Sequence, residues 1–274
     1  MLKIYNKTES KDKRTLHFLP GNSFTPCTYQ KILNQLSDNF LIKISLLRPL
    51  WDKEPMSNFK NWDIFLNDYM ESIETESNIV GIGHSIGGNL LLKAAILNPK
   101  KFDKIILLDP TFFTPSKILG WKIISFFNAQ SYFNSYIKSA ENKKMEYKSI
   151  KEMFSSYRKR RVFSKFSDED LKLLIESLAI DNNNKVNLIF DNKWDAAIYK
   201  TALINDMFIW KNISKLSTKT LIIRAENSDV FYKGTSNLVL KKNNNIHIKT
   251  IKDSDHLFPI NNSNETIDLI NQFI

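Results

Sequence analysis

The sequence predicts an α/β fold, in which a mostly parallel central sheet carries helices on both faces and a long helical segment interrupts the chain. Three observations support this fold class. Short apolar runs typical of buried strands alternate with amphipathic runs of helical period. The alternation stops near residue 112 and resumes near residue 216. One apolar run leads straight into a glycine-rich turn and then into a helical pattern.

Length and composition narrow the class of protein. The chain has 274 residues, 42% hydrophobic and 12% aromatic, which is enough for a large core. No apolar run of about 18 residues occurs, so no transmembrane helix is expected. The N-terminus lacks the apolar stretch of a signal peptide. Cys27 is the only cysteine, which excludes an internal disulfide and favours a reducing compartment, with the cytoplasm as the default.

The net charge of +10 is unevenly distributed. Residues 143–165 hold nine basic and two acidic side chains, centred on Arg158–Arg161. Such a run usually forms a solvated helical face, and we favour that interpretation. The alternative is a patch for an anionic substrate, a nucleic acid or a membrane surface. Nucleic acid is not an expected partner, whereas a weak surface contact remains open, as does the oligomeric state.

The first part of the chain predicts most of the sheet. An edge strand is expected at residues 2–6, and buried strands at 15–19, 40–47 and 102–109. Helical spacing predicts helices at residues 28–36 and 60–74.

Between these elements lies a motif that carries chemistry. Gly83, Ser85 and Gly87 form a G-x-S-x-G sequence between a strand pattern at residues 79–82 and a helix pattern at residues 86–97. A serine hydroxyl is a weak nucleophile that must stand exposed beside a base. A sharp strand-to-helix turn lifts it out of the sheet, and the crowded backbone leaves room only for small residues two positions away. The motif therefore predicts a nucleophile elbow at Ser85.

Residues 112–215 interrupt the α/β alternation. Helices are expected at residues 117–127, 148–157, 168–177 and 194–205. About a hundred residues between two core strands is too long for a loop, so the segment is expected to form a helical cap over Ser85. The predicted organisation is a first core part at residues 1–111, the cap at 112–215 and a second core part at 216–274.

The second core part predicts two more strands and a closing helix. The strands are expected at residues 220–226 and 246–251, and the helix at residues 265–273. Residues 230–241 are mixed or helical in pattern.

The base follows by elimination among four histidines. His17 and His247 lie within predicted strands, and His84 directly precedes Ser85 and cannot turn back onto it. His256 lies in a loop just past the last strand, at the sheet edge where ligands bind in open α/β folds. We therefore expect His256 to act as the base.

The acid is less clearly determined. In folds of this kind the chain order is serine, then Asp or Glu, then histidine. Asp229 follows the strand at residues 220–226 and is our preferred acid, with Glu226 and Asp109 as rivals. Asp109 ends a strand, but its expected role is to position the turn into the cap.

Together, Gly83-His-Ser-Ile-Gly-Gly88, Asp229 and His256 resemble the α/β-hydrolase superfamily with a cap after the sixth strand. The resemblance implies the α/β-hydrolase fold. It also implies an oxyanion hole made by two backbone N–H groups, those of Ile86 and Asn22. Similar proteins carry a His-Gly-x loop at the second position, where this chain has Pro20-Gly-Asn22.

The activity implied by the resemblance is that of a serine hydrolase acting through Ser85, His256 and Asp229. We expect a carboxylic ester or thioester with an apolar acyl part as its substrate. No cofactor or metal is expected, because the chain has neither a metal-ligand motif nor a phosphate-binding loop. The expected pocket residues are Phe24, Trp51, Phe112, Phe113 and Trp121.

Other chemistries use the same arrangement of residues. They include C–C bond hydrolases, lactonases, amidases and cofactor-free peroxidases, which the sequence does not separate. A different class of function is a non-catalytic binding protein that uses the basic cap.

Overall fold

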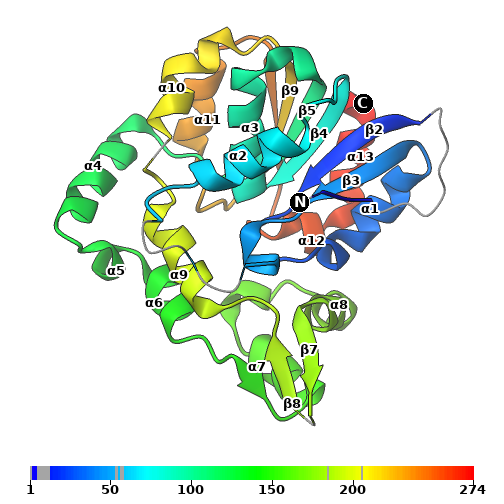
Figure 1. Cartoon of the computed structure of the whole chain (residues 1–274), viewed down its shortest axis with the longest axis vertical. Helices are drawn as coiled ribbons and strands as arrows, with labels where there is room; N and C mark the ends of the chain where they lie inside the picture. Colours follow the sequence, from blue (N-terminus) through cyan, green and yellow to red (C-terminus); the bar gives the residue numbers. More distant parts are fainter. Residues whose placement is uncertain (1, 5–12, 53–54, 56–58, 184, 205) are drawn as a thin grey trace.

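The computed structural model describes residues 2–4, 13–52, 55, 59–183, 185–204 and 206–274. Its centre is a seven-stranded sheet in the order β1-β3-β2-β4-β5-β9-β10 (Figure 1). Strand β1 pairs antiparallel with β3 at one edge, and every other neighbouring pair is parallel. The sheet therefore confirms the predicted fold class.

The strands lie close to their expected positions. They are β1 (Leu2–Ile4), β2 (Arg14–Leu19), β3 (Phe40–Ser45), β4 (Ile79–His84), β5 (Phe102–Leu108), β9 (Lys219–Ala225) and β10 (Ile246–Ile251). Because β4, β5, β9 and β10 run parallel to one another, their carboxyl ends meet at one edge of the sheet.

Helices cover both faces, as the nearly continuous apolar strands require. Along β5, Ile106 and Leu108 join one core cluster, whereas Ile105 and Leu107 join the other. The helices around the sheet are α1 (Gln30–Ser37), α2 (Asp63–Ser72), α3 (Ile86–Leu97), α11 (Lys233–Leu240), α12 (Phe258–Asn261) and α13 (Ser263–Phe273). The two-residue alternation of a strand thus divides the core into two layers.

The segment between β5 and β9, residues 112–215, is called the insertion below. Its helices are α4 (Pro115–Phe126), α5 (Gln130–Phe133), α6 (Ser135–Glu141), α7 (Ile150–Arg158), α8 (Asp168–Leu178), α9 (Asn192–Thr201) and α10 (Met207–Asn212). Helix α8 begins as expected, with Ser167 Oγ accepting a hydrogen bond from the N–H of Asp170. The four expected helices are present.

The insertion also contains a small antiparallel sheet that the sequence pattern did not predict. Its order is β6 (Glu146–Tyr147), β8 (Lys185–Leu188), β7 (Ala179–Asn182). These strands are two to four residues long, too short to show a clear alternation of polar and apolar residues.

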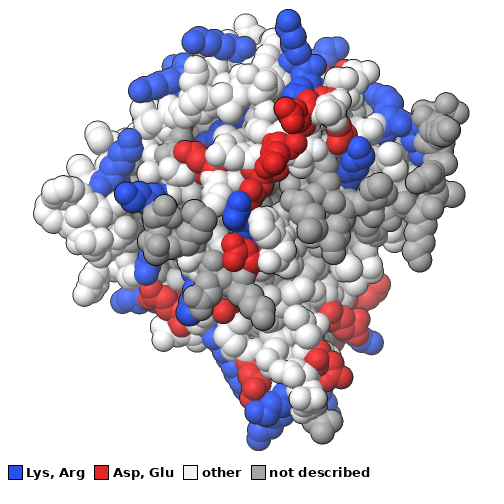
Figure 2. Space-filling model, in the orientation of Figure 1, with Lys and Arg blue, Asp and Glu red and all other residues white. Residues whose placement is uncertain are grey.

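Three of the nine basic side chains at residues 143–165 form ion pairs. Lys143 Nζ lies 2.7 Å from a carboxylate oxygen of Asp195, and Lys144 Nζ lies 2.6 Å from Glu152. Arg158 pairs with the carboxylate of Asp168. Figure 2 shows acidic and basic side chains interleaved over this part of the surface. The pairing supports the interpretation of this stretch as a solvated structural face.

None of the helices in the described ranges is both long and apolar enough to cross a membrane.

Candidate active site

Ser85 occupies the turn between β4 and α3. Its backbone has φ 57° and ψ −120°, a conformation that L-residues with a side chain rarely adopt. The turn is fixed on both sides, since the Ser85 N–H donates to Leu108 O at 3.0 Å and its carbonyl accepts from the N–H of Thr111 at 3.0 Å. The strained backbone lifts the Ser85 side chain above the carboxyl edge of the sheet.

The flanking glycines make this turn sterically possible. A Cβ atom at Gly83 would lie 2.5 Å from the carbonyl oxygen of Gly87, and one at Gly87 would lie 2.2 Å from that of Leu19. Both contacts involve backbone atoms, which cannot rotate away. The close packing also brings the start of α3 against the end of β2, and therefore beside the loop that begins at Pro20.

Replacing Gly87 with alanine is expected to destabilise the protein by roughly 3 kcal/mol or more, because the turn must distort to remove the clash. Gly120 in α4 is the matched control, since a Cβ atom there meets nothing within 4 Å. Gly120→Ala is expected to raise stability by about 0.5–1 kcal/mol through helix propensity. Urea unfolding of the two variants measures both effects. Equal stability of the Gly87→Ala variant and the wild type would contradict this account of the elbow.

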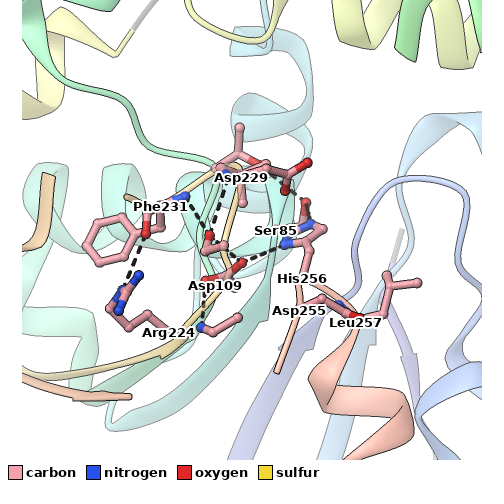
Figure 3. A network of polar contacts seen from close by, with 12 residues as sticks. Ser85, Asp109, Arg224, Asp229, Phe231, Asp255, His256 and Leu257 are labelled. Atoms are coloured by element: carbon pink, nitrogen blue, oxygen red, sulfur yellow. Dashed lines mark hydrogen bonds and ion pairs between the residues drawn. The ribbon is translucent and has the colours of Figure 1, made fainter. Parts of the chain in front are cut away.

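His256 stands between Ser85 and Asp109 (Figure 3). Its Nε2 lies 3.0 Å from Ser85 Oγ, and its Nδ1 lies 2.8 Å from Asp109 Oδ2. A proton on Nδ1 directed at the carboxylate leaves Nε2 free to accept the serine proton. Ser85 and His256 are thus brought together as the sequence predicted.

The preferred acid, Asp229, is not the partner of His256, and this corrects the sequence-based choice. Asp109 holds that position from the end of β5, between β4 and β9. Its Oδ1 accepts the Ala225 N–H at 3.0 Å, and its Oδ2 also accepts the Ser228 hydroxyl at 2.8 Å. Every one of these contacts donates a hydrogen bond to the fully buried carboxylate.

The two rejected acids have other partners. The carboxylate of Asp229 accepts a hydrogen bond from the hydroxyl of Tyr136, which comes from α6 of the insertion. Glu226 is exposed and accepts from the N–H of Asp253. Both residues follow β9 at the correct edge, but neither reaches Nδ1 of His256. The order of acid and base along the chain gave no information on this choice, because Asp109 also precedes His256.

The charge around His256 determines its protonation. Burial disfavours the imidazolium and lowers the pKa of His256, but the hydrogen bond and the charge of Asp109 outweigh burial. Asp229 and Asp255 add smaller contributions of the same sign. The resulting pKa of His256 lies above its ordinary value.

A second histidine, His84, contacts the backbone of His256. Tyr29 Oη accepts the Gly21 N–H at 3.0 Å and lies 2.7 Å from His84 Nδ1, while His84 Nε2 lies 3.0 Å from His256 O. A carbonyl only accepts, so His84 carries its proton on Nε2 and receives the Tyr29 hydroxyl on Nδ1. Burial, with the nearby His256, holds the pKa of His84 well below its ordinary value. This neutral pair connects the Gly21 loop to the backbone of His256.

The insertion holds the same loop from the opposite side. Asp195 of α9 accepts hydrogen bonds from Asn22 Nδ2 at 3.3 Å and from the Ser23 hydroxyl, and it pairs with Lys143. Ser23 has a positive φ of 62°, so these contacts stabilise an unfavourable backbone. No sequence pattern indicates this link, because Asp195 lies 172 residues from Ser23 along the chain.

Three of the expected pocket residues, Phe112, Trp121 and Trp51, lie outside any enclosed pocket, and the first two are buried. Phe112 is fully buried between Trp210 and Phe231, with ring centroids 4.7 and 6.4 Å away, and therefore belongs to the core. The indole N–H of Trp121 donates to Lys200 O at 3.2 Å inside the insertion. These two assignments are corrected, because buried rings that pack on their own neighbours do not line an open pocket.

Trp51 is 41% exposed, with the Arg48 guanidinium 4.9 Å from its ring centroid. It therefore lies on the surface rather than in an enclosed pocket. Phe24 packs beside His84 at 6.1 Å between ring centroids, and Phe113 is half-buried beside Tyr232 at 6.2 Å. The roles of Phe24 and Phe113 in binding a substrate stay predictions.

One polar neighbour of the nucleophile was not singled out from the sequence. Thr111 Oγ1 lies 3.2 Å from Ser85 Oγ. Asn89 Nδ2 donates to the carbonyl of Thr111 at 2.7 Å and to Asp206 Oδ1 at 2.8 Å. The carbonyl of Thr111 is thus held by Asn89 of α3, which Asp206 at the start of α10 also contacts, and the Thr111 hydroxyl lies beside that of Ser85.

Known proteins share this architecture. No family model matches the chain. An uncharacterized hydrolase of Bacillus subtilis, YugF, is 25% identical over 142 residues, which is 49% of this chain and 49% of YugF. The chain thus aligns with about half the length of that curated relative.

Solved structures match over nearly the whole chain. E-2-(acetamidomethylene)succinate hydrolase superposes with a TM-score of 0.77 at 14% identity, covering 99% of this chain and 93% of the other. The peroxisomal α/β-hydrolase Lpx1 of Saccharomyces cerevisiae superposes with a TM-score of 0.75 at 16% identity, covering 99% of this chain and 79% of Lpx1. A structure from work on carboxylesterases of Nitrososphaera gargenis superposes with a TM-score of 0.74 at 16% identity, covering 100% of this chain and 93% of the other. Sheet order, elbow and these similarities together identify the chain as a protein of the α/β-hydrolase fold.

Proposed function

We propose that the protein is a serine hydrolase that cleaves a carboxylic ester or thioester with an apolar acyl part. The observation that carries this proposal is the unbroken contact path from Ser85 Oγ through the His256 ring to the buried Asp109 carboxylate. Ser85 is the proposed nucleophile, His256 the base and Asp109 the group that orients it. A serine, a histidine and an acid in this geometry form the arrangement that activates a hydroxyl for acyl transfer.

The proposed reaction has two halves. In the first, Ser85 Oγ attacks the substrate carbonyl while His256 Nε2 takes the hydroxyl proton and returns it to the leaving alcohol or thiol. This leaves an acyl group on Ser85. In the second, His256 takes a proton from water, the hydroxide attacks the acyl carbonyl, and the returned proton releases Ser85 and the acid. Asp109 holds the tautomer and stabilises the imidazolium in both halves.

Negative charge develops on the carbonyl oxygen in both halves. We propose that the backbone N–H groups of Ile86 and Asn22 bind it. Ile86 is the first residue of α3, where unpaired N–H groups and the positive end of the helix dipole meet. The loop at Asn22 is held by Tyr29 below and Asp195 above. Rigid donors of this kind typically contribute about 10²–10³ in rate each.

The insertion is the proposed cap, and it would set the substrate. Its contacts with the Asn22 loop through Asp195 and with Asp229 through Tyr136 support this role. The structure from the work on carboxylesterases of Nitrososphaera gargenis and the thioesterase domain from the curacin biosynthetic pathway are similar in fold to this chain. These similarities support ester or thioester chemistry. A reducing, cytoplasmic setting remains an expectation from the single cysteine.

The proposal is tested with a series of p-nitrophenyl esters of increasing acyl length, and with a matched thioester and anilide. We expect turnover of the ester and thioester, with kcat/KM rising as the acyl chain lengthens. Ser85→Ala protein from the same purification is the control. Absence of turnover on the whole series would contradict the ester assignment. Turnover of the anilide alone would point to the amidase alternative.

The pH profile gives an independent check. Only neutral His256 accepts the serine proton, so kcat/KM should rise with pH through the pKa of His256 in the free enzyme. Because Asp109 raises that pKa, the midpoint should lie above the ordinary histidine value of about 6.5. Removing the negative charge of Asp109 favours the neutral imidazole, so Asp109→Asn should move the residual acid limb to lower pH. An acid limb at or below the ordinary value in the wild type would contradict this assignment.

A further inference from the structure

Helix α4 and the segment after it concentrate exposed apolar side chains. We call this set the α4–α5 surface: Leu119, Ile123, Phe126, Phe127, Tyr132, Phe133 and Tyr136. Phe126 is 81% exposed and Tyr132 is 83% exposed. Half of the large apolar side chains that are exposed in the described ranges fall within this short segment. Single exposed apolar residues are ordinary, but a contiguous group of them marks an interaction site.

The α4–α5 surface is not needed to attach α4 to the protein. The opposite face of the helix already packs through Ile118, which is fully buried, and through the hydrogen-bonded indole of Trp121. A surface helix normally has one apolar face and one polar face. Helix α4 instead presents apolar side chains to the solvent as well. The rings of Phe126 and Phe127 lie edge to face there, with centroids 5.2 Å apart.

The charged side chains within this segment of the chain are all basic, although the Asp229 carboxylate lies beside Tyr136 at its end. Residues 110–140 contain Lys117, Lys122 and Lys138 and neither aspartate nor glutamate. In the ranges that the structure describes, none of the three lysines pairs with a carboxylate. Instead, the ammonium groups of Lys117 and Lys138 lie over the rings of Tyr232 and Tyr132. Figure 2 shows this part of the surface as a mainly white area, with blue side chains along its upper edge and both blue and red side chains below it. It differs in this respect from the ion-paired stretch at residues 143–165.

We propose that the α4–α5 surface docks on an anionic lipid bilayer. Exposed aromatic side chains with flanking lysines are the combination that places a helix in the interface of such a membrane. The rings enter the boundary between head groups and acyl chains, while the lysines remain at the level of the anionic head groups. A second copy of the chain fits this surface less well, because self-association through it brings like charges together.

The docking surface adjoins the candidate active site. Tyr136, at its end, donates its hydroxyl to Asp229, and Asp229 contributes to the charge that acts on His256. A docked molecule would therefore hold the Ser85 side of the fold near lipid-borne esters. This consequence rests on the proposed function, whereas docking itself does not. Ser85→Ala should bind vesicles as the wild type does, so that loss of catalysis and loss of docking are measured separately.

The test is cosedimentation of the full chain with vesicles of phosphatidylcholine, with and without phosphatidylglycerol, at low salt. The first variant combines Phe126→Ser, Phe127→Ser and Phe133→Ser, and the second combines Lys122→Gln and Lys138→Gln. All five side chains are exposed, so folding should be little affected. The matched controls are Leu238→Ser with Leu240→Ser, and Lys241→Gln with Lys242→Gln, all exposed and on or next to α11.

The wild type should partition onto the anionic vesicles, and binding should weaken as salt is raised. The aromatic variant should lose at least about tenfold in partition coefficient. The lysine variant should lose about fivefold for each lysine, on anionic vesicles only. Both controls should bind as the wild type does. The proposal is overturned if the wild type binds neither kind of vesicle, or if the controls lose as much as the test variants. It is also overturned if the wild type is a dimer that does not bind vesicles and the aromatic variant is a monomer.

Discussion

Replacing Ser85 with alanine is expected to lower kcat for ester hydrolysis by about 10⁶-fold, because the variant has no group to attack the carbonyl. The change removes one hydroxyl whose neighbours are the His256 ring and Thr111. The fold should persist, since the backbone of the turn is held by its own hydrogen bonds. Initial rates with the preferred p-nitrophenyl ester, at matched thermal stability, measure the effect.

Comparison with variants of His256 and Thr111 shows whether the loss of activity in Ser85→Ala reflects the loss of the nucleophile. His256→Ala should cost about as much as Ser85→Ala, and the double variant should be no slower than either, because the two groups act as one unit. Thr111→Val is the control for simple disturbance of the Ser85 surroundings and should retain most of the activity. If Ser85→Ala hydrolyses the ester at a rate comparable with the wild type, the site is elsewhere.

Asp109→Asn is expected to lower kcat by about 10⁴-fold, whereas Asp229→Asn should stay within about tenfold of the wild type. Asparagine in place of Asp109 presents an NH₂ group or a neutral oxygen to His256 Nδ1. It therefore no longer fixes the tautomer that leaves Nε2 free. The substitution preserves volume, and an amide oxygen can still accept the Ala225 N–H.

The pair of variants also separates a catalytic effect from a structural one. Asp109 is fully buried with three donors, so Asp109→Asn should also cost stability, and its unfolding must be measured alongside its rate. The shift of the residual acid limb to lower pH is a readout that loss of stability alone would not produce. A large loss of kcat in Asp229→Asn with little loss in Asp109→Asn would restore the sequence-based choice.

The fold could be predicted because its signals are local. Residues 246–251 form a short, partly apolar run with polar residues on both sides, and this pattern identifies β10. The spacing of Gly83, Ser85 and Gly87 identifies the strained turn. The small sheet of the insertion escaped prediction because a pair such as Glu146–Tyr147 has no periodicity.

The acid was assigned wrongly because the decisive information is spatial. Asp109 directly follows β5, Asp229 lies in the loop after β9, and both precede His256 in the chain. What separates them is that Asp109 accepts the Ala225 N–H and the Ser228 hydroxyl, which fixes its carboxylate beside Nδ1 of His256. Those same bonds join the end of β5 to the end of β9, whereas the expected role of Asp109 in the turn into the cap stays a prediction. The contact of Tyr136 with Asp229 depends on the path of the insertion, and no sequence pattern reports that path.

The packing of aromatic residues shows the same limit. Phe112 and Phe113 are neighbours of identical type, yet one is fully buried and the other half-buried. Their aromatic side chains predicted that both line a pocket for an acyl group. Phe112 instead stacks on Trp210 and belongs to the core. Composition indicates that a segment is apolar, whereas the surface that each ring covers depends on contacts distant in the chain.

The central claim is that His256, oriented by Asp109, activates Ser85. Its most direct test is the rate at which a fluorophosphonate probe labels the protein, with the labelled residue mapped by mass spectrometry in the wild type and in the variants. We expect labelling of the wild type at Ser85, none at that site in Ser85→Ala, strongly slowed labelling in His256→Ala and Asp109→Asn, and nearly unchanged labelling in Asp229→Asn. Labelling at another residue, or a rate that falls with Asp229 and not with Asp109, would contradict the account.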